Sequence, residues 1–377
     1  MRIILFSGRG GSGVSTLSAA TALAAARTGC PTLAFSLGAG LGRALGVTPT
    51  KAVENVGPNL DLAQGGVGVE DEFREWLADL LDFRSMDSEL AEDLASLPGI
   101  NHIGRLLDLQ DLVSSGRYEV AVLDAAPLAM FLDLPAALES AARWLDRLFA
   151  PRQQSVFEPF VRAFAADYAN AGEQVFDTGR QLLTRLASLR GLLTDHETTS
   201  VRLVVAPDDS APGDLQEATG VLGLFGYLKD AVVVTKLIPD AVTDPFFAPA
   251  RKHQAELLER VRGSTSAPVL TSALRQEPPR GEAGLLDVAA EVYGESDPAG
   301  FLITGEPYEI TREGSKYFLQ VVLPFASHEE LKLEQADEGI VVHLNGRRRL
   351  FPLPDEVGMR EASTWTHDGH ILRVTIE

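Results

Sequence analysis

Residues 2–16 read RIILFSGRGGSGVST, and this stretch decides the fold. The continuous apolar run Ile3–Phe6 predicts a short strand that is buried on both faces. The glycine-rich loop Gly8–Thr16 follows, and the alanine-rich segment Thr16–Arg27, which ends before Gly29, predicts a helix. A strand, a glycine-rich loop and a helix in this order direct main-chain amides and the positive end of the helix dipole toward one spot. The sequence therefore predicts a phosphate seat at the beginning of the first helix.

Further apolar runs predict an α/β fold with a mostly parallel sheet. Five more segments resemble the first strand, namely 31–37, 118–127, 200–206, 231–237 and 268–274. A helix is predicted near 212–225, and strands that alternate with helices form a parallel sheet covered by helices. The segment from about 128 to 197 has no strand signal, and leucines recur there at helical spacing: Leu182, Leu186, Leu189 and Leu193. We therefore expect a helical insertion after the 118–127 strand.

The pattern changes after a linker near Glu295–Gly300. Short alternating segments follow, and Asn345-Gly346 and Asp368-Gly369 lie between them as hairpin signals. Alternation places two sets of apolar side chains on one face of their strands: Leu372, Val374 and Ile376, and Tyr317, Leu319, Val321 and Leu323. We predict two domains, residues 1–295 with the parallel sheet and residues 300–377 as a small all-β sandwich.

Composition excludes several function classes. The formal net charge of the 377-residue chain is −20, which repels nucleic acid and anionic membranes. The single cysteine, Cys30, cannot form an internal disulfide or a thiolate metal site within one chain. The sequence has no apolar run long enough to span a membrane, and its beginning lacks the features of a signal peptide. We expect a cytoplasmic protein.

Two motifs fit the glycine-rich loop. Gly8, Gly10 and Gly13 satisfy the dinucleotide pattern G-x-G-x-x-G, but that pattern needs an acidic residue about 20 positions on. Phe35 and Ser36 end the second strand instead, so a dinucleotide oxidoreductase is disfavoured. The other fit is a Walker-type loop, in which a hydroxyl of Ser15 or Thr16 holds Mg²⁺. The later strand VAVLDAAP supports it, because Asp124 stands where a magnesium-associated carboxylate belongs.

With these motifs the first 295 residues resemble the ArsA ATPase family, which includes arsenite-pump ATPases and ATPases that target tail-anchored membrane proteins. That family has the loop G-K-G-G-V-G-K-T/S-T, which six residues match here: Gly8, Gly10, Gly11, Gly13, Ser15 and Thr16. The resemblance implies ATP or ADP and Mg²⁺ as cofactors, with Asp124 as the catalytic residue and Ser15 and Asp124 as metal ligands. It implies that the nucleotide is bound by Gly8, Arg9, Gly10, Gly11, Ser12, Gly13, Val14, Ser15, Thr16, Thr235 and Lys236. Thr235 aligns near the adenine-contacting asparagine of the family.

The chain departs from the family at residues that carry chemistry. Arg9 replaces the lysine that reaches across a dimer interface, and Val14 replaces the P-loop lysine. The switch Asp-Pro-Ala-His is reduced to Ser36–Ala39, and the switch Asp-Thr-Ala-Pro-Thr-Gly-His is reduced to Asp124–Met130. Val14 cannot place a cation on the phosphates, although Arg9 could partly compensate from its own chain or from a partner. Our hypothesis is weakened nucleotide binding with slow or absent hydrolysis.

The other segments also carry resemblances. In the targeting branch the inserted helices form a hydrophobic client groove, which would be lined here by Trp144, Leu145, Leu148, Phe149, Phe157, Phe160 and Phe164. Apolar stripes at this spacing are also typical of ordinary core. Residues 317–342 and 362–376 resemble the α-crystallin domain of small heat-shock proteins. Within it, the run Arg347–Arg349 is interpreted as a solvated hairpin edge.

These resemblances give one leading interpretation and one alternative. The first is a homodimeric, nucleotide-regulated protein that binds or targets hydrophobic protein segments, with dimer closure as the switch. The family's zinc-binding Cys-x-x-Cys pair is absent, which excludes a zinc-bridged dimer but not a dimer. Arsenite capture, which relies on cysteines, is excluded on the same count. The alternative is a catalytically dead pseudo-ATPase, a scaffold or sensor that binds another phosphate ligand or none.

Overall fold

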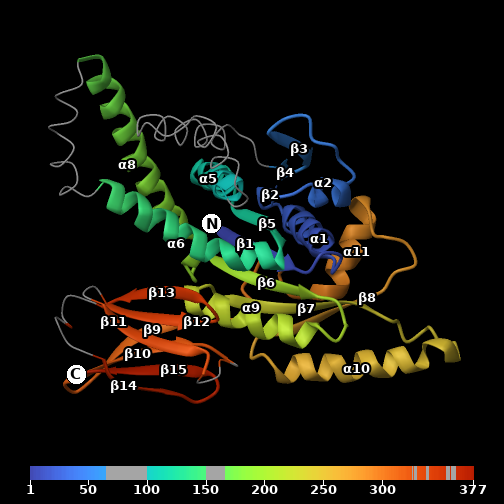
Figure 1. Ribbon diagram of the computed structural model, residues 1–377. Coiled ribbons are helices and arrows are strands. Elements are labelled where there is room, and N and C mark those ends of the chain that lie inside the picture. Colours follow the sequence, from blue (N-terminus) through green and yellow to red (C-terminus); the bar gives the residue numbers. More distant parts are fainter. Residues whose placement is uncertain are drawn as a thin grey trace.

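The computed structural model describes residues 1–64, 100–149, 166–324, 326, 329–336, 339–353, 357 and 362–377. Two regions of sheet structure are present, a large sheet with helices and a smaller all-β part at the C-terminus (Figure 1). We call the smaller part, which contains the strands between residues 308 and 376, the β-domain.

The large sheet has eight strands in the order β3-β4-β2-β5-β1-β6-β7-β8. The pairs are parallel except for β3 with β4. The strands are β1 (Arg2–Gly8), β2 (Thr32–Ser36), β3 (Val53–Gly57), β4 (Leu60–Ala63), β5 (Val120–Pro127), β6 (Thr199–Val205), β7 (Lys229–Leu237) and β8 (Val269–Ala273). The mostly parallel sheet and all six predicted strands are confirmed, whereas the edge hairpin of β3 and β4 was not predicted.

Helices cover both faces of this sheet. They are α1 (Val14–Arg27), α2 (Gly40–Leu45), α5 (Ile100–Ser114), α6 (Leu128–Phe149), α8 (Ala166–Thr194), α9 (Ala211–Phe225), the 3-10 turn η1 (Pro245–Phe247), α10 (Ala248–Gly263) and α11 (Gly281–Tyr293). Alternate residues of β1 enter different cores: Ile4 packs with α1, α2 and α11, whereas Ile3 packs with α5, α6, α8 and α9. This alternation explains why the β1 sequence is continuously apolar.

The predicted helical insertion consists of α6 and α8, which pack against each other (Figure 1). The four leucines of the helical stripe, residues 182, 186, 189 and 193, are all buried, so this stripe is ordinary core. Of the residues proposed for a client groove, Phe157, Phe160 and Phe164 lie outside the described residues. Trp144, Leu145, Leu148 and Phe149 lie in α6, but their side chains fall outside the description. The groove therefore stays a prediction.

Two antiparallel sheets form the β-domain. One has the order β14-β15-β10-β9 and the other β11-β12-β13. The strands are β9 (Tyr308–Glu313), β10 (Lys316–Val322), β11 (Leu331–Ala336), β12 (Gly339–Leu344), β13 (Arg347–Pro352), β14 (Ala362–His367) and β15 (Ile371–Ile376). Asn345-Gly346 joins β12 to β13 and Asp368-Gly369 joins β14 to β15, which confirms both hairpins. The apolar faces predicted for β10 and β15 are buried.

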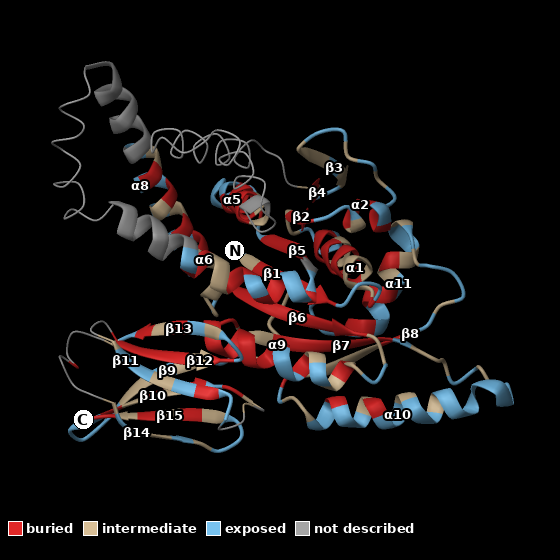
Figure 2. Cartoon of the chain, viewed as in Figure 1, coloured by how far each residue is buried: buried red, intermediate tan, exposed pale blue. Residues whose placement is uncertain are grey.

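The β-domain docks against α9 and α6 (Figures 1 and 2). A Cβ added to Gly223 of α9 would lie 1.9 Å from the Val322 carbonyl oxygen, so a glycine is needed where the two backbones meet. Arg349 is only 2% exposed, and its Nη1 donates to the Leu224 carbonyl at 2.8 Å. The interpretation of the arginine run as a solvated edge is thus wrong for Arg349. It is also wrong for Arg347, whose guanidinium pairs with carboxylates of α6 and α9, Asp133 at 3.0 Å and Glu217 at 3.3 Å.

A buried ion pair fastens the linker to the large sheet. Arg202 of β6 and Asp230 of β7 are both fully buried, and Arg202 Nε lies 3.2 Å from Asp230 Oδ1. The guanidinium of Arg202 also donates to the carbonyls of Pro298 and Gly300, at 2.6 and 2.7 Å. The chain between the two parts is therefore bound to β6, an interior strand of the large sheet.

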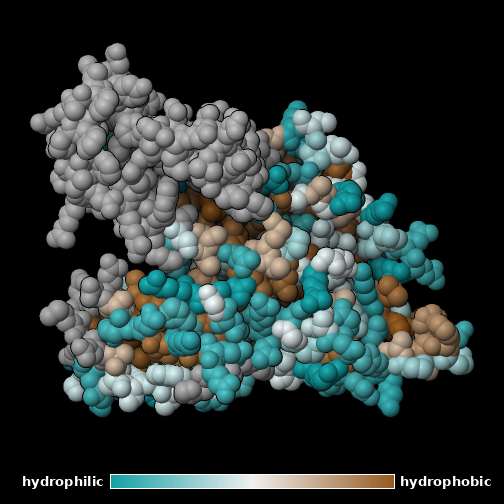
Figure 3. Space-filling model, in the orientation of Figure 1, coloured by the Kyte–Doolittle hydropathy of each residue, from teal (hydrophilic) through white to brown (hydrophobic). Residues whose placement is uncertain are grey.

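The surface has one exposed aromatic pair among the described residues. Phe246 is 81% and Phe247 is 39% exposed in η1, and Figure 3 shows hydrophobic surface around the beginning of α10. Within the described ranges, every helix is too short or too polar to cross a membrane.

Candidate nucleotide-binding site

The site is built on the loop between β1 and α1. Gly13 precedes α1 with φ 101° and Gly11 has φ 83°, a region that favours glycine. Gly8 is needed for a different reason, because an added Cβ would lie 2.1 Å from the Val204 carbonyl oxygen of the neighbouring strand. The first amides of α1 lack intrahelical partners, as at every helix N-terminus. In this protein the first residues of α1 line an open cavity.

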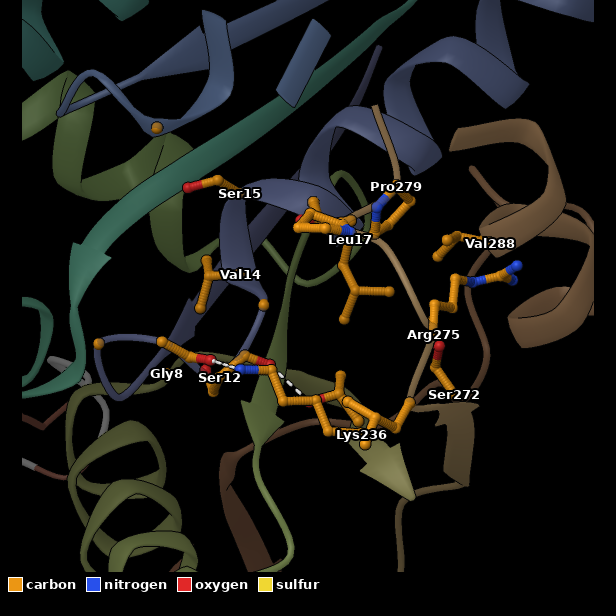
Figure 4. Close-up of a pocket in the computed structure, with 18 of the residues that line it drawn as sticks. Gly8, Ser12, Val14, Ser15, Leu17, Lys236, Ser272, Arg275, Pro279 and Val288 are labelled. Carbon is orange, nitrogen blue, oxygen red and sulfur yellow. Dashed lines mark hydrogen bonds between the residues drawn. The ribbon is translucent and has the colours of Figure 1, made fainter. Parts of the chain in front are cut away.

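This cavity has a volume of about 800 Å³. All residues that the sequence assigned to the nucleotide and the metal line it, namely Gly8 to Thr16, Asp124, Thr235 and Lys236. The order of the strands determines which residues lie at each end of the cavity. β5 and β2 lie on one side of β1, so Asp124 of β5 lies at one end. β7 and β8 lie on the other side of β1, so Lys236 and Ser272 lie at the other end (Figure 4).

Asp124 and Ser15 face each other at the β5 end. Ser15 Oγ donates to Asp124 Oδ2 at 2.6 Å, and Asp124 is 8% exposed. Burial raises the pKa of Asp124, while hydrogen bonds from Ser15 and Ser36 act in the opposite direction. Gly40, the first residue of α2, packs on this pair, since an added Cβ would lie 2.1 Å from Ser15 Oγ and 3.3 Å from Asp124 Oδ2. A hydroxyl beside a carboxylate at the mouth of a phosphate seat fits Mg²⁺, which takes oxygen ligands and completes its shell with phosphate and water.

Two side chains of β7 support the loop from the opposite end. Thr235 is buried, and its Oγ1 donates to the Ser12 carbonyl at 2.5 Å. The ammonium of Lys236 donates to the Gly11 carbonyl, and Lys236 adopts a left-handed backbone with φ 58°. Both contacts hold the loop by its main chain, which requires no particular side chain in the loop itself.

Arg9 lines the cavity, but its charge is engaged by α9. Its guanidinium forms an ion pair with Asp214 of α9 at 2.5 Å and is 60% exposed. The nearby Asp208 has a lowered pKa, chiefly because of the Ser210 hydroxyl and with a smaller contribution from Arg9.

Sequence reasoning missed several residues that line the cavity. Gly38, Gly40 and Arg43 reach it from the beginning of α2, and residues 272–279 reach it from the end of β8. Arg43 follows the reduced switch Ser36–Ala39 and belongs to no motif of its own. No motif marks residues 272–279.

A mostly parallel sheet with helices on both faces, and a glycine-rich loop between its central strand and first helix, define a P-loop-type nucleoside-triphosphatase fold. The chain belongs to the anion-transporting ATPase (ArsA) family, whose model matches residues 1–294. Residues 314–376 match the model of an HSP20-like domain found in ArsA. Both resemblances seen in the sequence are therefore confirmed.

Several relatives align with this chain over most of their own length. A protein of Chlorobaculum tepidum that is provisionally named an arsenical pump-driving ATPase is 26% identical over 94% of this chain and 90% of its own length. Protein SCO2128 of Streptomyces coelicolor is 30% identical over 99% of this chain and 95% of its own length. Protein Rv2184c of Mycobacterium tuberculosis is 28% identical over 92% and 89%, respectively.

Proposed function

We propose that this chain binds ATP or ADP with Mg²⁺ in the cavity at the beginning of α1, and that hydrolysis there is slow or absent. The observation that carries the proposal is the open cavity of about 800 Å³, which contains the helix N-terminus, the Ser15–Asp124 pair and the supported loop. A helix N-terminus attracts phosphate through free amides and the helix dipole.

Each residue has a role in this proposal. Loop amides from Gly10 to Thr16 bind the phosphates, and Ser15 and Asp124 hold Mg²⁺. The metal, when bound, neutralises phosphate charge. Thr235 and Lys236 fix the loop by their contacts with the Ser12 and Gly11 carbonyls, which keeps the amides available for the phosphates.

Slow hydrolysis follows from the carboxylates available. Among the described residues that line the cavity, the carboxylates are Asp124 and Glu277. Asp124 is assigned to the metal, and Glu277 follows β8, at the opposite end of the cavity from Asp124. Ser36, which stands in place of the family's switch aspartate, is buried and lacks a carboxylate to orient the attacking water.

Titration calorimetry with Mg²⁺–ATP and Mg²⁺–ADP tests binding, and a phosphate-release assay tests turnover. Gly10 is a suitable position for a matched pair of variants, because among the described residues nothing lies within 4 Å of an added Cβ. Gly10→Asp places a negative charge at the phosphate seat and should weaken binding at least tenfold, whereas Gly10→Ser should bind nearly as the parent does. Equal affinity in all three proteins, or no binding by the parent, would favour the pseudo-ATPase alternative. Rapid turnover would contradict slow hydrolysis.

We also propose the division into a nucleotide-binding domain, residues 1–295, and the β-domain, residues 300–377, and a homodimer that binds hydrophobic protein segments through the inserted helices. Family membership and the extension of α6 and α8 away from the sheet support this part (Figure 1). Light scattering with and without nucleotide measures the dimer. Cross-linking to a synthetic apolar helix, compared with a scrambled polar peptide, measures client binding, and equal labelling by both peptides would argue against it.

Arsenical transport, which the names of several relatives suggest, is not part of the proposal. Trivalent arsenic is captured by clustered thiolates, and this chain has only the half-buried Cys30.

A further inference from the structure

Among the described residues, four cationic side chains line the cavity: Arg9, Arg43, Lys236 and Arg275. Three of them are already engaged. Arg9 pairs with Asp214 at 2.5 Å, Arg275 pairs with Glu291 of α11 at 2.6 Å, and Lys236 donates to the Gly11 carbonyl. Arg43 differs from these, because within the described ranges it forms no ion pair, and its contact is a bond from Nε to the Ala39 carbonyl at 3.3 Å.

The position of α2 brings Arg43 to the Asp124 end of the cavity. β2 runs beside β5, with Ser36 opposite Asp124, and α2 begins four residues later at Gly40. Gly40 packs on the Ser15–Asp124 pair, and Arg43 lies one turn further on the same side of the helix. The bond to the Ala39 carbonyl turns the side chain back toward the beginning of α2, as helical side chains generally lean. Its guanidinium is therefore directed toward the end of the cavity that holds the proposed metal site.

We propose that Arg43 supplies, within one chain, the phosphate-binding cation that Val14 cannot supply, and that it contacts the terminal phosphate of a nucleoside triphosphate. This inference rests on the proposed nucleotide site and makes that site more specific. Guanidinium is suited to the role because it can donate two parallel hydrogen bonds to a phosphate. The ligand is then a magnesium nucleoside triphosphate, bound in preference to the diphosphate.

The arrangement also explains how the site tolerates valine at position 14. A lysine there would reach the phosphates from the loop, whereas Arg43 reaches them from α2, across the Ser15–Asp124 pair. No covalent step is involved, so Arg43 is a binding residue that discriminates between ligands by their number of phosphates.

The test compares Arg43→Gln and Arg43→Lys with the full-length parent by calorimetry, using Mg²⁺–ATP and Mg²⁺–ADP. One charge-assisted contact corresponds to roughly a tenfold to hundredfold change in affinity. We expect Arg43→Gln to lose that much affinity for ATP and less than threefold for ADP. Arg43→Lys should recover part of the loss. The matched control is Arg27→Gln, an exposed arginine at the far end of α1 that pairs with Glu282, and it should bind both nucleotides as the parent does.

The outcomes separate this inference from the proposed function. If the parent binds both nucleotides and Arg43→Gln binds ATP equally well, Arg43 is not the phosphate cation. An equal loss for ATP and ADP would overturn the contact with the terminal phosphate. If the parent binds neither nucleotide, the proposed function fails, and the role of Arg43 fails with it. Arg43→Lys retains the charge, so it keeps the comparison valid if the glutamine variant folds poorly.

Discussion

Replacing Arg349 by methionine tests how the β-domain is held against the helices of the large sheet. The Arg349 side chain is 3% exposed and projects from β13 toward the end of α9. Its Nη1 donates to the Leu224 carbonyl at 2.8 Å, and its guanidinium carbon lies 4.8 Å from the Tyr308 ring centre and 4.6 Å from that of Phe351. Methionine has a similar length and no charge, so the change removes the polar contacts while it retains most of the packing.

The expected loss of stability is about 3 kcal/mol. A buried hydrogen bond from a charged donor contributes roughly 1.5–3 kcal/mol, and each cation–π contact contributes about 0.5–2 kcal/mol. The net loss is smaller than the sum of these contributions, because a buried guanidinium carries a desolvation cost that a buried methionine does not. Glu139, 4% exposed, would keep its partner Arg190 at 3.1 Å, so the variant leaves no unpaired acid.

Urea unfolding followed by circular dichroism and by tryptophan emission measures the change. Arg348→Met, at the exposed neighbouring position, is the control and should lie within about 0.5 kcal/mol of the parent. In Glu139→Gln the buried Arg349 would lose its nearby carboxylate, at 3.9 Å, and we expect a loss of roughly 3 kcal/mol or more. The double variant should cost at least about 1 kcal/mol less than the sum of the single losses. Equal stabilities of Arg349→Met and Arg348→Met would refute this account of the docking.

Single substitutions at Lys229, Gly8 and Lys236 should each have a measurable effect. Burial lowers the pKa of Lys229 from 10.5 to about 8, so between these values the unfolded chain binds more protons than the folded chain. The unfolding free energy of the protein, measured by urea titration, should therefore rise from pH 8 to pH 10. Lys229→Met should abolish the part of this rise that comes from Lys229. Gly8→Ala forces apart the backbones of β1 and β6 and should cost about 2 kcal/mol or more in the same assay, whereas Gly29→Ala has room for the Cβ and should lose only the smaller cost of a positive φ. Lys236→Ala removes the contact with the Gly11 carbonyl and should weaken Mg²⁺–ATP binding by roughly three- to tenfold in calorimetry; unchanged affinity would show that the loop does not need this support.

Local sequence signals predicted the elements that are buried by their own composition. The strand Ile3–Phe6 was predicted because a short continuous apolar run is typical of a strand that is buried on both faces. The loop was predicted because its glycines, such as Gly13, can adopt a left-handed backbone. The edge hairpin Val53–Ala63 was missed because its first strand is only half-buried and its sequence mixes polar and apolar residues without a clear period. An edge strand is specified by its neighbour more than by its own pattern.

Ion pairs explain most of what the sequence could not predict at the site. Arg9 and Arg43 are both arginines close to the phosphate seat, and only the fold shows that Asp214 of α9 engages the first of them. The same holds for Arg349, whose partners include Glu139 of α6, the Leu224 carbonyl of α9 and the Tyr308 ring of β9. A contact between residues far apart in the sequence produces no periodic pattern. The local sequence therefore indicated only that the arginine run was solvated surface.

The position of α6 determines which experiments can separate the two parts of the chain. This helix begins at Leu128, directly after the strand that carries Asp124, and it then presents Asp133 and Glu139 to the β-domain. The apolar core is also continuous, since residues of α9 and of β10 and β12 belong to one cluster. Deletion of the β-domain would therefore expose core side chains and unpair charges on the helix that follows Asp124. A loss of nucleotide binding after such a deletion could not be attributed to the site, and for that reason point variants in the full chain, with Arg348→Met as their control, are the sound way to assign function.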